Sequence, residues 1–274
     1  MAQEKFNPWH GSVASSIAEF HDRISMMAPR CNDRMLFRGQ GVIANPLPRF
    51  HRMGVVKDGL PELEKLQIRE FLARFSRGYA KDSESQAEWK ILALLQHFGG
   101  FTRLLDWSHD CLVALWFAVE SRRRDAHKDD EHAAVWVVIP LETDWVNSDD
   151  LTTNSPCKID TVKFVEPYDV DMRVVSQGSF LSVHPFPRSP MDILTGFTSH
   201  WEKLRKLGRM FQIQIPAEFL DSVLKELVQL GIDKVSIYPE RRPDIEHYVQ
   251  MFNSQYSDAP EVIFETISKS VHVS

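Results

Sequence analysis

The sequence is poor in cysteine and has none of the common catalytic or nucleotide-binding signatures. Its three cysteines lie far apart and form no CxxC pair. This sparse count suits a reducing compartment and excludes a disulfide framework or a paired-cysteine zinc site. The chain contains no GxGxxG, Walker A, HExxH or GxSxG motif, and its eleven histidines show no paired spacing. We therefore expect no metal site and none of the enzyme classes that those motifs identify.

Charge and hydropathy exclude further classes of protein. No apolar run approaches the roughly 20 residues of a membrane-spanning helix. The first thirty residues include Glu4, Glu19 and Asp22, which is not the pattern of a signal peptide. The formal net charge of −6 provides no global basic field for non-specific nucleic-acid binding, although a local patch stays open. The expected location is the cytoplasm, and no membrane partner is expected.

What the sequence does contain is an interleaved pattern of helices and strands. Its 274 residues are 43% hydrophobic, enough for one domain or two. Apolar spacing predicts helices at 11–29, after Pro61, at 86–98, after Ser108, at 217–230 and at 243–252, and strands at 34–37, 134–139, 161–165, 180–184, 209–215 and 235–238. Segments 121–132 and 141–160 are expected to be a solvated loop and an irregular stretch. Because several strands are consecutive, we expect an α+β fold with a mixed or antiparallel central sheet flanked by helices.

The first candidate for a functional motif is Phe37-Arg38-Gly39-Gln40. An arginine at the end of a strand can present its guanidinium to a ligand, and Gly39 would let that ligand approach the backbone. The Gln40 amide can both donate and accept hydrogen bonds. The alternative interpretation is a surface arginine at a turn.

The second candidate is segment 96–108, which concentrates polar side chains between two predicted amphipathic helices: His97, Thr102, Arg103, Asp106 and Ser108. We interpret it as a loop that leads into a helix N-terminus, with Ser108 as the N-cap. Together with Arg38 and Arg103, such a terminus would suit an anion such as a dinucleotide diphosphate. Each residue also has a structural interpretation, such as a buried histidine or an Asp106–Arg103 pair.

A third region, Arg173 to Phe180, has the pattern of a turn into a strand with polar side chains at the turn, including Gln177. A plain β-turn explains it equally well.

At these three places the sequence resembles the FRG-domain family, which is named for its (Phe/Tyr)-Arg-Gly motif. The resemblance covers about residues 30–250 and implies an N-terminal helix over 1–30, an FRG domain over 31–255 and a C-terminal tail over 256–274. Its most specific block is the stretch from Gln96 to Ala118, and the third block is matched by Arg173, Gln177, Gly178 and Phe180. The sequence departs from the family pattern at Phe101, Ser108 and Ser176.

The family tends to occur in bacteria and phages near toxin or defence systems, so the resemblance implies a toxin or an antiphage role. A more distant likeness to ADP-ribosyltransferases implies a split sheet and NAD as the cofactor. In that family an arginine holds NAD, a Ser/Thr braces the site and a glutamate grips the ribose. Arg38 and Ser108 would take the first two roles. Gln177 stands where the glutamate is expected, and a neutral amide cannot replace its charge.

Three hypotheses follow. The chain is an enzyme that transfers or hydrolyses the ADP-ribosyl unit of NAD. In that case Arg38, Asp106, Ser108 and Gln177 are catalytic, and the ligand-binding residues are Gly39, Gln40, His97, Thr102, Arg103 and Arg173. Alternatively, it is a non-catalytic module that recognises a nucleotide, a nucleic acid or a phage protein. In the third hypothesis, Arg38, Asp106 and Trp107 form a buried salt-bridged network with a purely structural role.

Overall fold

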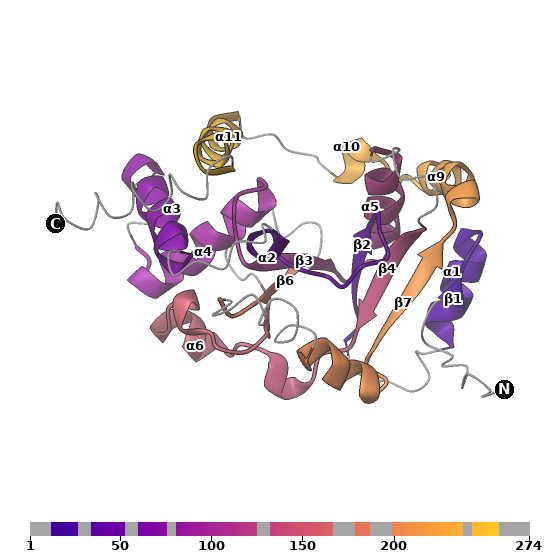
Figure 1. Cartoon of the computed structure of the whole chain (residues 1–274), viewed down its shortest axis with the longest axis horizontal. Helices are drawn as coiled ribbons and strands as arrows, with labels where there is room; N and C mark the ends of the chain where they lie inside the picture. The colour runs from indigo at the N-terminus through magenta and orange to yellow at the C-terminus, as the bar shows by residue number, and fades with distance from the viewer. Residues whose placement is uncertain are drawn as a thin grey trace. The chain divides into compact units, whose positions relative to one another are not determined.

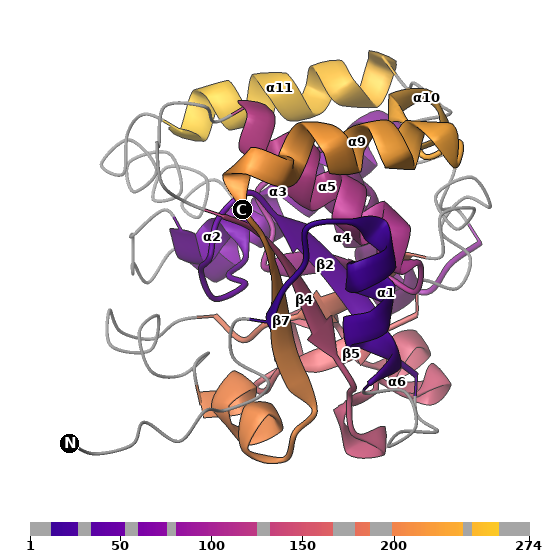
Figure 2. The same ribbon diagram turned by 90° about the vertical axis from the view of Figure 1, so that its right-hand side faces the viewer.

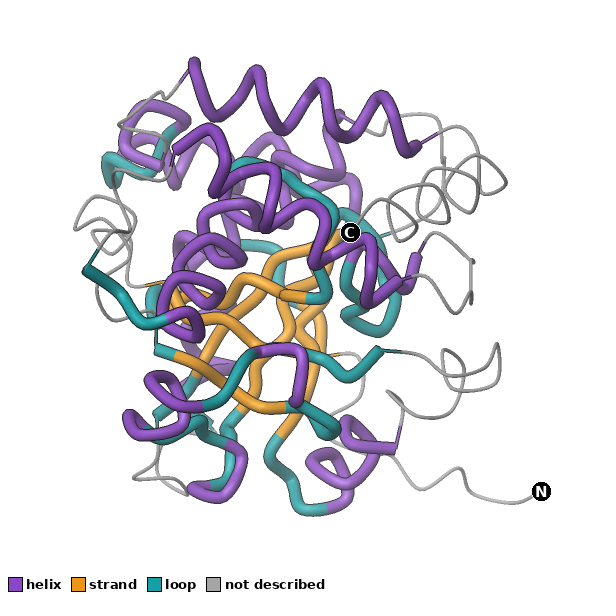
Figure 3. The backbone as a smooth tube through the Cα atoms, turned by 90° about the vertical axis from the view of Figure 1, so that its left-hand side faces the viewer, coloured by secondary structure: helices purple, strands orange, loops and turns teal. Residues whose placement is uncertain are grey.

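The computed structural model describes residues 12–26, 34–52, 60–75, 81–124, 132–166, 179–186, 199–237 and 243–257. Figure 3 shows the helices and strands of this part of the chain. The strands are β1 (Ser12–Val13), β2 (Leu36–Gln40), β3 (Leu104–Ser108), β4 (Ala133–Val138), β5 (Lys163–Val165), β6 (Ser179–Val183) and β7 (Met210–Ile215). They form a mixed sheet in the order β1-β7-β4-β2-β3-β6-β5. In this sheet β1 runs parallel to β7, and the pairs β2–β3, β2–β4, β4–β7 and β5–β6 are antiparallel. The expected α+β fold with a mixed sheet is confirmed.

The described α-helices are labelled in Figure 1. They are α1 (Ile17–Ser25), α2 (Arg49–Arg52), α3 (Leu60–Phe75), α4 (Glu84–His97), α5 (Cys111–Arg124), α6 (Ser148–Thr153), α9 (Leu220–Gln229), α10 (Lys234–Ile237) and α11 (Pro243–Ser257). Short 3-10 turns lie at Glu142–Asp144, Pro156–Lys158 and Ala217–Phe219. Among the described residues, no helix is long and apolar enough to cross a membrane.

The chain divides into two compact units, each assembled from three stretches of sequence. The first unit contains Met1–Pro46, Trp107–Leu141 and His200–Pro239. The second contains Leu47–Asp106, Glu142–Ser199 and Glu240–Ser274. Each unit has its own apolar core and is described by itself.

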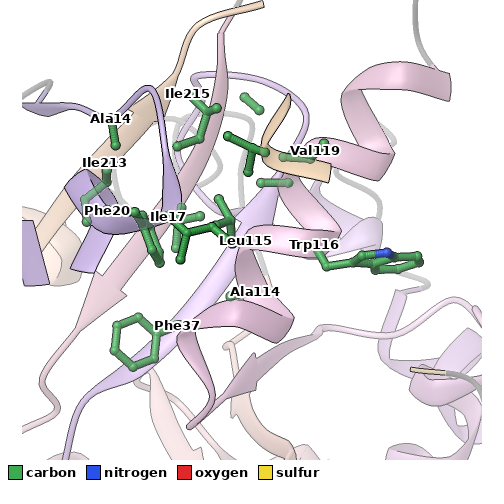
Figure 4. Packing of buried hydrophobic residues seen from close by; sticks show 14 of the residues in the cluster. Ala14, Ile17, Phe20, Phe37, Ala114, Leu115, Trp116, Val119, Ile213 and Ile215 are labelled. Carbon is green, nitrogen blue, oxygen red and sulfur yellow. The ribbon is translucent and has the colours of Figure 1, made fainter. Parts of the chain in front are cut away.

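The core of the first unit lies between one face of β2, β4 and β7 and the helices α1, α5 and α9 (Figure 2). Strand residues that alternate along the chain reach this core, among them Phe37, Val135 and Ile213. Figure 4 shows Phe37 near Ala114 and Leu115 of α5, with Ile17 and Phe20 of α1 beside them. This arrangement follows from period-two burial on the strands and a helical stripe on each helix.

The second unit is built mainly from helices. Apolar residues of α3, α4 and α11 form its largest cluster, and Tyr248 of α11 donates a hydrogen bond to the Gln67 carbonyl of α3 over 2.9 Å. A smaller cluster packs Trp89 and Leu92 of α4 against Val165 of β5 and Leu181 of β6. The helix expected at 86–98 begins earlier because Ser83 and Gln86 form a capping box. As predicted, it ends at the glycine pair, where Gly99 has φ 76°.

Several local predictions are wrong. Segment 102–108 is not a loop: Leu104–Ser108 forms β3, and Phe37 pairs with Ser108. The helix expected at 11–29 begins only at Ile17, after the Ser16 cap. The expected solvated loop at 121–132 begins later than predicted, because α5 continues to Arg124. The expected irregular stretch 141–160 contains α6 and two 3-10 turns.

The strand predicted at 235–238 is also wrong, because Lys234–Ile237 is helical. The Asp233 carboxylate accepts hydrogen bonds from the backbone nitrogens of Val235 (2.9 Å) and Ser236 (2.8 Å). The Ser236 hydroxyl in turn accepts from the Asp233 nitrogen. This reciprocal cap stabilises a helical turn over the strand that the β-branched residues favour.

Candidate functional site

Arg38 lies on the face of the first unit's sheet that points away from α5. Successive side chains of a strand point to opposite faces. Phe37 belongs to the core beside α5, so Arg38 and Gln40 project from the other side. Arg38 is half-buried, in the interior of the strand and not at its end, because β2 continues to Gln40.

Gly39 has a packing role that corrects the hypothesis of ligand approach. A Cβ atom at this position would overlap the Ala114 carbonyl oxygen and lie 2.5 Å from the Ala118 nitrogen. Both atoms belong to the α5 backbone. The missing side chain therefore lets a helix, rather than a ligand, approach the strand.

The face that bears Arg38 continues across the neighbouring strands. Arg38 pairs with Trp136 of β4, and Trp136 pairs with Gln212 of β7. The next row of the same face contains Gln40, Ala134 and Gln214. We call the polar and aromatic part of this surface the Arg38 face; its residues are Arg38, Gln40, Trp136, Gln212 and Gln214.

Gln212 is the most unusual residue of the Arg38 face. Its side chain is only 4% exposed. Its amide oxygen accepts a hydrogen bond from Gln214 Nε2 over 3.1 Å, but its own amide nitrogen has no partner among the described residues. An unsatisfied buried amide costs about 1–3 kcal/mol. A ligand or an ordered water that accepts from this amide would remove that cost.

The segment 44–46 is fixed beside the Arg38 face by side-chain donors. The Ala44 carbonyl accepts from Trp136 Nε1 (3.0 Å) and from Gln40 Nε2 (2.9 Å). The two next residues accept from side chains of the helical segment 200–206: Asn45 Oδ1 from Arg205 Nη2 (2.5 Å) and the Pro46 carbonyl from Trp201 Nε1 (3.3 Å). The amide donor of Gln40, which we expected to contact ligand, is thus used within the protein.

Arg205 brings a second guanidinium to the Arg38 face. Its guanidinium carbon lies 5.1 Å from the centre of the Trp136 ring, within the range of a cation–π contact. Burial lowers the pKa of Arg205, and the charge of Glu202 opposes that shift. The side chain nevertheless stays cationic at physiological pH, because an arginine has a very high ordinary pKa.

Ser108 is not the N-cap of α5. Its hydroxyl accepts a hydrogen bond from the Asp110 nitrogen over 2.9 Å, and it is buried at the end of β3. The capping acceptor is Asp110, whose Oδ1 receives the nitrogens of Leu112 (2.8 Å) and Val113 (3.4 Å). Ser108 therefore braces the turn between β3 and α5, which is compatible with the bracing role that the resemblance implies.

In the second unit, Gln96 links Thr102 and Asp106 of segment 96–108. Gln96 Nε2 donates to Asp106 Oδ2 over 2.5 Å, and Thr102 Oγ1 donates to Gln96 Oε1. Thr102 Oγ1 also accepts from the Leu104 nitrogen over 3.3 Å. Asp106 itself is exposed, so this chain of bonds holds a solvent-accessible carboxylate in one orientation. A buried network that includes Asp106, as the structural hypothesis requires, does not match this exposure.

The charge of the Asp106 carboxylate also acts on His97. Burial lowers the pKa of His97, and the Asp106 charge offsets part of that shift. A neutral imidazole near an oriented carboxylate can act as a base or as a hydrogen-bond partner. Among the described residues, no group of three or more His, Cys, Asp or Glu side chains is arranged to hold a metal ion.

Arg103 points into the interior of the second unit. Its Nε donates to Glu64 Oε1 over 3.0 Å, and both side chains are completely buried. The other guanidinium nitrogens donate to the His184 carbonyl (2.8 Å) and the Pro156 carbonyl. This geometry favours a structural role over the phosphate contact that we expected, since breaking a buried ion pair typically costs about 3–5 kcal/mol.

The sequence analysis missed Trp136, Arg205 and Gln212. A signal for Gln212 was present: if Phe211, Ile213 and Ile215 alternate into the core, then Gln212 and Gln214 must occupy the opposite face. Arg173 and Gln177 lie outside the described residues, so their predicted roles stay predictions.

Comparison with known families finds a match over part of the chain. Residues 33–127 fit the family model of the FRG domain. This range includes the Arg38 motif and the whole Gln96–Ala118 block, and it ends before the third block. No curated protein and no solved structure matches the chain.

Proposed function

We propose that this chain, whose residues 33–127 fit the FRG-domain model, binds a phosphate group of NAD or a related nucleotide on the Arg38 face. We further propose that it acts on this ligand as an ADP-ribosyltransferase-like enzyme. The observation that carries the proposal is the position of Arg38, half-buried between strand neighbours on the sheet face that α5 does not cover.

The chemistry of the Arg38 face supports an anionic ligand. Arginine and phosphate form charge-assisted hydrogen bonds, which are about twice as strong as neutral ones. Gln212 adds a buried amide donor that lacks an acceptor among the described residues. A nucleotide supplies acceptors of both kinds, phosphate oxygens for Arg38 and ribose hydroxyls or carbonyl oxygens for an amide.

In the proposed reaction, the bond between the nicotinamide nitrogen and ribose C1′ breaks and its electron pair leaves with nicotinamide. Water or a nucleophile on a target molecule then forms a bond to C1′ and releases its proton. The transition state carries positive charge on the ribose, which a carboxylate stabilises. Asp106 stays the candidate for this charge that the sequence suggested; within the second unit its side chain is exposed and oriented by Gln96.

Two measurements test the proposal. Calorimetry against NAD, ADP-ribose and AMP measures binding, and chromatography of the same mixtures measures released nicotinamide. We expect Arg38→Ala to weaken nucleotide binding by roughly 10- to 100-fold, the value of a charge-assisted contact. Lys225→Ala is the matched control because it removes one positive charge from an exposed position on α9. A flat calorimetric response of the unmodified protein to all three nucleotides would overturn the proposal.

One observation favours a non-catalytic alternative. Gln177 stands where ADP-ribosyltransferases carry a glutamate, and a neutral amide cannot serve as the general base. A binding module would give the same calorimetric response to nucleotides but no nicotinamide. Its partner would be a nucleotide alone or a nucleotide-modified protein or nucleic acid.

The toxin or antiphage role follows from the resemblance alone. An enzyme that consumes NAD or modifies an essential target would arrest the growth of a bacterial host. Induced expression should therefore slow growth, and Arg38→Ala should relieve the effect at equal protein level. Equal growth inhibition by both proteins would count against this role.

A further inference from the structure

We propose that Arg205 is a second phosphate-binding residue and that the ligand of the Arg38 face contains a diphosphate bridge. This inference rests on the proposed function and narrows its ligand from nucleotides in general to those with two linked phosphates. ADP-ribose and NAD belong to that class, whereas AMP does not.

Two arginines lie next to Trp136, one by strand pairing and one by a cation–π contact. Arg38 is the strand neighbour of Trp136, and residues paired in this way have Cβ atoms about 4.5–5.5 Å apart. Arg205 reaches the same ring from the helical segment 200–206, with its guanidinium carbon 5.1 Å from the ring centre. Two cations that flank one side chain suit a ligand that carries two negative charges on adjacent groups.

Two buried donor atoms on this surface, Arg205 Nε and Gln212 Nε2, have no hydrogen-bond acceptor among the described residues. Arg205 Nη2 has an acceptor in Asn45, but Arg205 Nε has none among the described residues. Gln212 Nε2 also has no acceptor among the described residues, and Gln212 is only 4% exposed. Both atoms are hydrogen-bond donors. A ligand that satisfied them would have to bring acceptors, and a cation that has already lost part of its hydration gains most from an anionic acceptor.

Arg103, which the sequence suggested as the second phosphate ligand, does not lie on this surface. Its donors contact Glu64 and two backbone carbonyls in the interior of the second unit. The sequence-based hypothesis needed a second guanidinium on the surface that bears Arg38, and Arg205 provides it beside Trp136.

A purely structural role for Arg205 is the competing explanation, because its bond to Asn45 fixes segment 44–46. Two variants separate the roles. Arg205→Met keeps a long side chain against Trp136 but removes the charge and the donors. Asn45→Ala removes the same bond to Arg205 and leaves its charge in place.

The experiment measures the dissociation constants of ADP-ribose and AMP by calorimetry at one fixed ionic strength. We expect the unmodified protein to prefer ADP-ribose by roughly 10- to 100-fold, the value of one charge-assisted contact. Arg205→Met should reduce that preference to less than about threefold, whereas Asn45→Ala should retain it. Arg38→Ala should weaken the binding of both ligands.

Each contrary result has its own meaning. Equal affinity of the unmodified protein for ADP-ribose and AMP would overturn the diphosphate inference and leave nucleotide binding intact. A loss of preference in Asn45→Ala as large as that in Arg205→Met would assign Arg205 to the segment 44–46 and also overturn the inference. Binding of neither ligand would overturn this inference and the proposed function together.

Discussion

The packing of α5 against β2 makes a sharp prediction for the substitution Gly39→Ala. The new methyl group would collide with the Ala114 carbonyl oxygen and the Ala118 nitrogen of α5. These are backbone atoms of a helix, so they cannot rotate away as a flexible side chain would. The strand and the helix must separate to admit the methyl group, and the packing around Phe37 and Leu115 must loosen with them.

The expected cost can be estimated from known cases. Overpacking of a core by one or a few methylene groups costs about 1–3 kcal/mol, and occasionally more. Because helix backbone is struck here, we expect the upper end, about 3 kcal/mol. For a protein of this size a loss of 1 kcal/mol lowers Tm by about 2–4 °C, so Gly39→Ala should lower Tm by roughly 6–12 °C.

Gly208→Ala is the matched control in the same unit. Gly208 has φ 69° and open space around its Cα, so alanine there costs only the left-handed backbone penalty of about 1–2 kcal/mol. Thermal and urea unfolding followed by circular dichroism would compare the two variants. If Gly39→Ala proves as stable as Gly208→Ala or more so, the close approach of α5 to β2 is refuted and the glycine needs another explanation.

Two further predictions concern buried polar groups. Gln212→Leu removes an unsatisfied amide and one hydrogen bond to Gln214. Urea unfolding should therefore show a free energy of unfolding that is unchanged or higher by up to about 2 kcal/mol, and calorimetry should show weaker ADP-ribose binding. A destabilised variant with normal binding would contradict this. Burial lowers the pKa of His51 to about 4 from 6.5, so between these values the unfolded chain binds a proton that the folded protein does not. Stability should therefore fall as pH drops through this window, by about 2.5 kcal/mol between pH 7 and 4.5 from this group, and His51→Gln should show a shallower pH dependence in urea unfolding than the unmodified protein.

Regular apolar spacing made much of the fold predictable. The helices α3, α4, α9 and α11 and the strands β4 and β7 lie close to where that spacing put them. The errors fall where a distant partner or a cap decides the local structure. Segment 104–108 is a strand because β2 pairs with it, and the residues of the segment alone do not predict that pairing. The turn at 234–237 could have been predicted, since Asp233 and Ser236 form a capping pattern in the sequence itself.

The candidate site was predicted in part. The sequence singled out Arg38 and the Gln96–Ser108 block, and the structure links Thr102 and Asp106 of that block through Gln96. It could not reveal that Arg103 pairs with Glu64, because the two residues are 39 positions apart and only the folded chain brings them together. Arg205 was invisible for the same reason: its partner Asn45 is 160 positions away.

The way in which the chain is divided between its two units limits how it can be cut into fragments. The division falls between Asp106 and Trp107, inside β3, and each unit draws on three separated stretches of sequence. No single cut can release either unit as a continuous fragment, and the stretch 33–127 contains pieces of both. A fragment limited to residues 33–127 would lack core residues of both units, among them Ile213 of the first and Tyr248 of the second. We therefore expect such a fragment to aggregate rather than fold.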